Sequence, residues 1–240
     1  MSVSHPVVAT PLQAHIPPEL ERLVQRARSR LDKHDKKAGV ELLVDAYCDL
    51  IDTTLLELME RIGQHYDARQ IGDGIRMAND VKAKAKHYVP WAAGFIAERR
   101  LPPVIHHFHG LMQPISSPRG DGHHIILPLS AGTATDAERI LASLHDQSAK
   151  DLHEGIELLC LVVAELMVPL ATEPKNLLNF NFVVNKPLDG VIALSQSIIT
   201  RLLRQMGNQI PPDLYPMVAE HIGSFLLLPE AGRQTSDVQG

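Results

Sequence analysis

The chain of 240 residues is long enough to bury a substantial core and fits one large domain or two small ones. Apolar residues make up 45% of it and aromatic residues only 4%, so aliphatic side chains have to form the core. The net charge of −5 at pH 7 argues against non-specific binding to nucleic acid.

The N-terminal sequence lacks the basic and apolar regions of a signal peptide, which predicts a cytoplasmic protein. The most apolar stretch, 155–171, contains Glu157 and Glu165 and is interrupted by Pro169. It therefore falls short of the roughly 20 apolar residues of a membrane-spanning helix. No membrane partner is expected.

Residues 1–17 contain three prolines and no hydrophobic period, which predicts a flexible N-terminal arm. A helical domain is expected over 18–229, followed by a polar C-terminal tail over 230–240. The first helix is expected to begin at Pro18, because proline suits the first turn of a helix. The clearest helix lies over 40–66, where the apolar face is broad enough for burial against more than one neighbour.

The middle of the chain predicts a break in this helical pattern. A helix that starts near Ile75 is expected to end or kink at Pro90. Residues 101–130 then predict a long connection rich in histidine, proline and glycine, with one short β-hairpin near 115–130.

Helical patterns resume in the C-terminal half. Thr135 and Glu138 match a capping box, which predicts the start of a long helical stretch that extends to about Val168. Two more helices are expected over 187–208 and 211–230. The predicted fold class is all-α: a single domain of six to eight helices, with the hairpin as its one β element.

Histidines gather in the predicted connection, in "VIHHFHG" at 104–110 and "DGHH" at 121–124. Neutral imidazole is the commonest metal ligand near neutral pH. Two histidines with one carboxylate suit Fe(II), and three histidines suit catalytic zinc. The candidate metal ligands are His106, His107, His109, Asp121, His123 and His124.

The spacing of these residues matches no established metal motif, since neither HExxH nor ExxH occurs. Structural or solvent-exposed histidines are therefore the competing interpretation. Asp45, Asp49 and Asp52 repeat at helical spacing and have ligands that Mg²⁺ or Ca²⁺ would accept, but the polar stripe continues along the same helix and indicates a solvated face. No Walker A, GxGxxG or GxSxG motif occurs.

Two hypotheses for the function remain. The first is a non-enzymatic intracellular binding or regulatory protein, which presents an apolar groove to a protein partner or to a small apolar ligand. The second is a metal-dependent enzyme that uses Fe or Zn held by the histidines at 106–124. A weaker third is an effector-binding domain separate from its DNA-binding partner.

The C-terminal half also predicts self-association. The stretches 155–170 and 191–203 offer more apolar surface than one layer of helices hides easily. Large exposed apolar patches on soluble proteins usually mark an interface, and a two-fold homodimer is the commonest solution. We therefore expect a homodimer packed through C-terminal helices.

Overall fold

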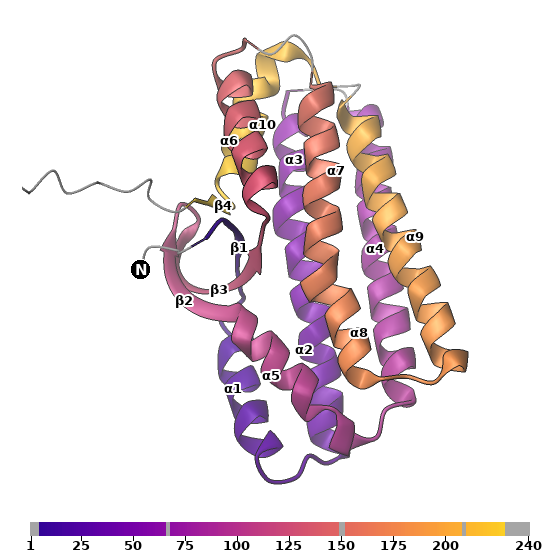
Figure 1. Cartoon of the computed structure of the whole chain (residues 1–240). Helices are drawn as coiled ribbons and strands as arrows, with labels where there is room; N and C mark the ends of the chain where they lie inside the picture. Colours follow the sequence, from indigo (N-terminus) through magenta and orange to yellow (C-terminus); the bar gives the residue numbers. More distant parts are fainter. Residues whose placement is uncertain (1–4, 66–67, 149–151, 208–209, 229–240) are drawn as a thin grey trace, which may run out of the picture.

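A computed structural model describes residues 5–65, 68–148, 152–207 and 210–228 (Figure 1). The protein is predominantly helical, at 74%, and carries a small four-stranded antiparallel sheet. The helical majority predicted from the sequence is confirmed. The all-α class is corrected, because the sheet is larger than one hairpin and includes both ends of the described chain.

Four long helical stretches form a bundle (Figure 1). Helix α4 contacts both α2 and α9, and α9 in turn contacts α7. The helix expected over 40–66 is present as part of the first stretch. The four stretches are α2 (Lys33–Ile51) with η1 (Asp52–Leu56) and α3 (Glu57–Gly63); α4 (Ala68–Gly94); α7 (His153–Met167) with η3 (Val168–Thr172) and α8 (Glu173–Leu178); and α9 (Phe182–Gly207).

Shorter elements cover one side of this bundle (Figure 1). Two helices lie beside its lower half: α1 (Ile16–Ala27) and α5 (Pro102–Leu111), which η2 (Glu98–Arg100) precedes. Two lie beside its upper half: α6 (Ala131–His145) and α10 (Tyr215–Gly223), which η4 (Pro212–Leu214) precedes. The largest buried apolar cluster lies in the upper half, where α6 and α10 pack on the bundle.

The sheet lies between these two covers, in the order β2-β3-β1-β4. Its strands are β1 (Val7–Pro11), β2 (Met112–Ser117), β3 (Gly120–Pro128) and β4 (Leu226–Leu227). The prediction of a flexible arm over 1–17 is wrong for the described part of that range. Val7 and Ala9 are buried on one face of β1 and Val8 on the other, because strand side chains alternate and this strand is covered on both faces.

The prediction of an irregular connection over 101–130 is also wrong. Helix α5 begins there with prolines in its first turn, where the missing N–H groups cost nothing. The hairpin near 115–130 is present as β2 and β3, with Gly120 at φ +117° in the turn. The predicted capping box at Thr135 is wrong too: α6 starts one turn earlier, and the Ser130 hydroxyl accepts the Thr133 N–H at 3.2 Å. The tail predicted over 230–240 lies outside the described residues.

One segment among the described residues, His153–Leu178, is long and apolar enough to cross a membrane by length and composition. Only 28% of its most apolar window is buried inside the protein. Glu165 within it accepts hydrogen bonds from the Ser130 N–H at 2.9 Å and from the Thr133 hydroxyl at 2.6 Å, so this helix is tied to the start of α6.

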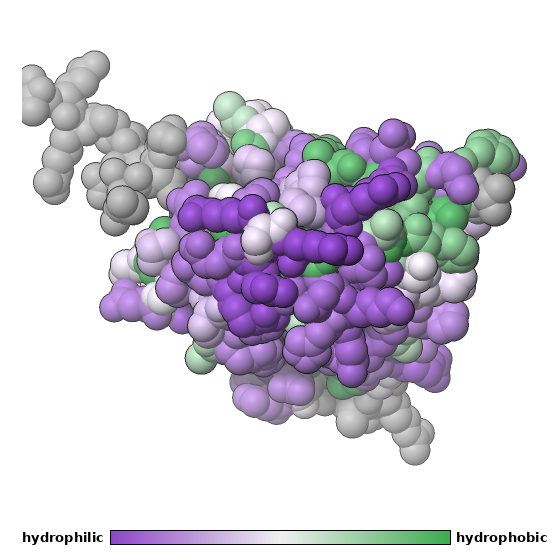
Figure 2. All heavy atoms as spheres, turned by 90° about the horizontal axis from the view of Figure 1, so that it is seen from below, coloured by the Kyte–Doolittle hydropathy of each residue, from purple (hydrophilic) through white to green (hydrophobic). Residues whose placement is uncertain are grey.

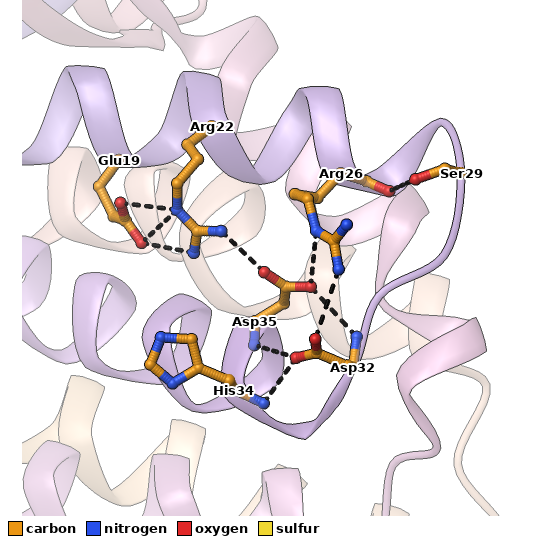
Figure 3. A network of polar contacts seen from close by, with 7 residues as sticks. All are labelled: Glu19, Arg22, Arg26, Ser29, Asp32, His34 and Asp35. Carbon is orange, nitrogen blue, oxygen red and sulfur yellow. Dashed lines mark hydrogen bonds and ion pairs between the residues drawn. The ribbon is translucent and has the colours of Figure 1, made fainter.

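A buried carboxylate joins α1 to α2 at the lower end of the bundle (Figure 3). Asp35 is 3% exposed and accepts hydrogen bonds from Arg22 at 2.8 Å and from Arg26 at 3.2 Å. It also accepts the backbone N–H of Asp32, whose side chain caps α2. Burial alone would raise the pKa of the Asp35 carboxyl, but these donors outweigh it and lower that pKa.

We predict that Asp35→Asn lowers the free energy of unfolding by about 2 kcal/mol or more, because hydrogen bonds to a charged acceptor are lost in a buried position. A group with a lowered folded-state pKa stabilises the fold above its unfolded pKa, and this contribution is lost as the pH falls through the folded value. Urea denaturation measures the free energy of unfolding of the wild type and of Asp35→Asn. The difference between these two values should shrink below about pH 4.

The matched control is Glu19→Gln, which removes the half-exposed partner of the same Arg22. Such a pair contributes at most about 1 kcal/mol. Equal losses for the two variants would contradict the central role of Asp35.

Candidate ligand-binding site

The lower half of the bundle encloses a cavity of about 300 Å³ that is partly open to solvent. Three of the four long stretches line it with turns that face inward: α2, α4 and α9. The fourth wall is η3 with α8, and α1 and α5 close the side nearest the sheet (Figure 1). The cavity is therefore built between helices, a common place for a ligand site in a bundle.

The lining is almost entirely aliphatic and aromatic. The few polar residues among it are Asp35, Lys36, Tyr47, Lys84, Tyr88, Lys175 and Ser195. Most of these are already engaged. The Lys36 amine donates to the Ile96 carbonyl at 2.6 Å, and Lys175 pairs with Asp189 at 2.5 Å.

Three lining residues differ from the rest. Within the described part of the chain, the Lys84 ammonium, the Tyr88 hydroxyl and the Ser195 hydroxyl have no hydrogen bond or ion pair. All three side chains are partly buried. They are the lining groups free to recognise a polar atom of a ligand.

The wall formed by η3 is a π-helix that contains Pro169. The wider turn and the missing proline N–H change the hydrogen bonding of the helix backbone here. The Tyr47 hydroxyl donates to the Leu170 carbonyl, and His107 Nε2 donates to the Pro169 carbonyl at 2.7 Å. Burial raises the pKa of the Tyr47 phenol, so it stays protonated and able to donate.

A second π-helix, η1, interrupts the opposite stretch at the upper end of the cavity. His221, from α10, is 1% exposed, and its Nε2 donates to the Thr54 carbonyl at 3.1 Å. Burial lowers the pKa of His221, so the ring is neutral at pH 7. Both π-helices thus have a carbonyl held by a side chain from another element.

The histidines predicted as metal ligands on α5 have different surroundings. His106 is exposed. His107 is bound to the Pro169 carbonyl, with Nδ1 at 3.7 Å from Glu173. His109 Nε2 lies 4.0 Å from Glu21 of α1.

The three candidates on β3 are separate again. The His124 ring is 1% exposed and bonded within the hairpin, with Nε2 at 2.9 Å from the Ser117 hydroxyl and Nδ1 at 3.0 Å from the Gly122 carbonyl. Asp121 is exposed, and His123 faces Pro114 across the ladder. Within the described ranges no group of three or more His, Cys, Asp or Glu is arranged to hold a metal ion.

The aspartates at helical spacing on α2 and η1 also have separate partners. Asp52 pairs with Lys82 at 2.5 Å, and Asp45 lies 3.5 Å from His15. Asp49 accepts a hydrogen bond from Gln13, and burial raises its pKa. This agrees with a polar face rather than a cation site.

Apolar side chains also reach the surface. Seen from below, the end of the bundle is mainly hydrophilic, and apolar side chains gather on the side where α4 and α9 lie in Figure 1 (Figure 2). The large apolar residues that are exposed are Trp91, Phe95, Leu161, Val168, Leu177, Phe182 and Leu194.

Comparison with known proteins gives no relative: no protein family, curated protein or solved structure matches this chain. The candidate site is therefore argued from its own geometry.

We predict that His107→Ala lowers the free energy of unfolding by about 1–3 kcal/mol, because the Pro169 carbonyl loses its donor in a buried position. His106→Ala, one residue away and exposed, should change it by no more than about 0.5 kcal/mol. Urea denaturation of the two variants checks this. Two equally stable variants would mean that the η3 carbonyl finds another donor.

Proposed function

We propose that this protein binds a small apolar ligand in the cavity between α2, α4, α9 and η3–α8. The observation that carries the proposal is a volume of about 300 Å³ with an almost wholly apolar lining. An engineered apolar cavity of roughly 150 Å³ already takes up benzene. This cavity has twice that volume, and it lies in the size range of natural ligand pockets.

The energetics favour an occupant. Side chains of the protein leave this volume unfilled, although protein interiors are normally close-packed. At roughly 24 cal/mol per Å³, a closed, unfilled cavity of this size would cost roughly 7 kcal/mol. This cavity is partly open to solvent, so that figure is the upper limit of the free energy that a ligand would recover by filling it.

The competing functions have less support. A partner helix requires a long open groove, whereas α1 and α5 close one side of this cavity. A metal-dependent reaction requires ligands that converge, whereas His107, His109 and His124 have separate partners and no group of three candidates converges within the described residues. A regulatory role, in which the ligand is an effector, is compatible with the same cavity.

We expect the neutral probe N-phenyl-1-naphthylamine to bind with one-to-one stoichiometry and increased fluorescence. Ala85→Phe should weaken this binding roughly tenfold or more, because Ala85 lines the cavity and a phenyl ring would occupy it. Fluorescence titration of the wild type and the variant measures both effects.

Ala83→Phe is the matched control. Ala83 lies on the same helix but is exposed and does not line the cavity, so the affinity should stay within about twofold of the wild type. Absence of saturable probe binding to the folded wild type would refute the proposed function.

We also propose that two copies associate through the outer face of α7 and α9. The Glu157–Arg204 pair, at 2.8 Å, fixes the register of these antiparallel helices. It places Val168 and Leu194 at the same level, 45% and 46% exposed. Leu161 lies two turns from Val168 on the same face of this stretch and is also exposed. The low burial of the most apolar window of His153–Leu178 also supports association through this face.

Sedimentation equilibrium in detergent-free buffer should therefore give about twice the chain mass of 26.5 kDa. Leu161→Glu combined with Leu194→Glu should give the monomer, while Leu177→Glu, at an exposed site off this stripe, should leave the dimer intact. A monomeric wild type would refute the dimer. Solubility only in detergent would assign the face to a lipid bilayer instead.

A further inference from the structure

We infer that the ligand is a single-chain amphiphile with a carboxylate head, and that Lys84 and Ser195 bind this head. The inference rests on the proposed function, because it names the class of molecule that the same cavity takes. It starts from Lys84 and Ser195, whose hydrogen-bonding capacity is unused among the described residues; the Tyr88 hydroxyl, one helical turn below Lys84, is a third such group.

The register of two bundle helices brings these groups together. Helices α4 and α9 run antiparallel (Figure 1), and a Cβ added at Gly74 would lie 3.4 Å from Leu202 Cδ1, so these two residues face each other. Ten residues further along α4, Lys84 lies level with Ile192 of α9. Ser195 is three residues from Ile192, less than one helical turn. An ammonium and a hydroxyl therefore face the cavity at nearly the same height.

The charge of the lining selects an anion. Of its three lysines, Lys175 pairs with a carboxylate and Lys36 donates to a backbone carbonyl, whereas Lys84 has no partner within the described structure. The single lining carboxylate, Asp35, is neutralised by two arginines. A partly buried ammonium without a partner is unfavourable, and a carboxylate that accepts from it and from the Ser195 hydroxyl would remove that cost.

The length of the cavity favours a ligand with a hydrocarbon chain. Below Lys84 the cavity continues along α4 to Ala93, nine residues further, which corresponds to about 14 Å of helix. The α4 side chains that line this lower part offer a hydrocarbon chain no further charged group. They are Ala85, Tyr88, Val89, Ala92 and Ala93.

An aromatic stripe joins this part of the cavity to the surface. Tyr88, which lines the cavity, contacts Trp91 edge to face at 6.4 Å between ring centroids, and Trp91 contacts Phe95 in the same way at 5.1 Å. Trp91 is 37% and Phe95 54% exposed. Tyr88 and Trp91 lie on the same face of α4 as Lys84, at spacings of four and three residues, and Phe95 follows the end of the helix. The three rings therefore offer an apolar path from solvent to the head-binding pair.

The test is displacement of N-phenyl-1-naphthylamine by dodecanoate and by dodecan-1-ol, two ligands with the same chain and different heads. We expect the wild type to bind dodecanoate more tightly. Lys84→Gln should weaken dodecanoate roughly tenfold or more and leave dodecan-1-ol within about twofold, because a charge-assisted hydrogen bond is lost only for the carboxylate.

Lys86→Gln is the matched control, since it removes an equal charge from an exposed site on the same helix and should change neither affinity. Lys84→Arg, which keeps the charge, should retain most of the dodecanoate affinity. Ser195→Ala should weaken dodecanoate by about threefold or more, and it supplies the test if Lys84→Gln does not fold.

The outcomes separate the two proposals. If both ligands bind equally and neither the Lys84 nor the Ser195 variant distinguishes them, the carboxylate inference is overturned while apolar binding stands. If neither ligand displaces the probe and the probe itself does not bind, the proposed function fails.

Discussion

A buried carbonyl needs a donor, and this requirement shapes the wall of the cavity. Pro169 and the π-turn of η3 change the hydrogen bonding along the most apolar helix of the protein. The two carbonyls at this point are bound by Tyr47 from α2 and His107 from α5. These bonds hold three elements around one volume, and one of them occupies the hydroxyl of Tyr47, which lines the cavity. The lining is apolar partly for this reason.

Most charged groups around the cavity likewise have partners within the protein. At the lower end, Asp35 is enclosed by Arg22 and Arg26, and the Lys36 and Lys175 ammonium groups are held by a carbonyl and a carboxylate. The ion pairs of Asp35 and Lys175 cancel charges that would otherwise act on a ligand in the low dielectric of the interior, and the carbonyl takes up a donor of Lys36. Lys84 is the charged lining residue that has no partner among the described residues.

Helical periodicity identified much of the bundle because its signal is local. The broad apolar face over 40–66 and the pattern over 187–208 both correspond to bundle helices. Strand β1 gave no such signal, since it is five residues long and its main partner, β3, lies more than a hundred residues away. The two π-helices change the phase of a helix without changing its apolar pattern, so periodicity passes over them.

Residues that cluster in the sequence do not cluster in the same way in space. The histidines at 106–109 lie on a helix and those at 123–124 on a strand, so geometry directs them to different partners. Two residues that line the cavity with a free polar group stand in no sequence motif: Lys84 is one of three alternate lysines over 82–86, and Ser195 has no catalytic motif around it. One local signal did exist, because Lys84 lies between Val81 and Tyr88 on a face that is otherwise apolar.

The division of the bundle into two halves links stability to binding. The upper half contains the largest buried cluster, which joins residues of α6 and α10 to residues of α3, α4, α7 and α9. The lower half contains the cavity, which α2, α4, α9 and η3–α8 enclose. The tightly packed upper half thus stabilises a fold whose lower half is less tightly packed. This is expected where a binding site is maintained at some expense of stability. A ligand that binds only the folded state returns part of that stability, about 2.7 kcal/mol at a hundredfold excess over its Kd, so occupancy and folding of the lower half are coupled.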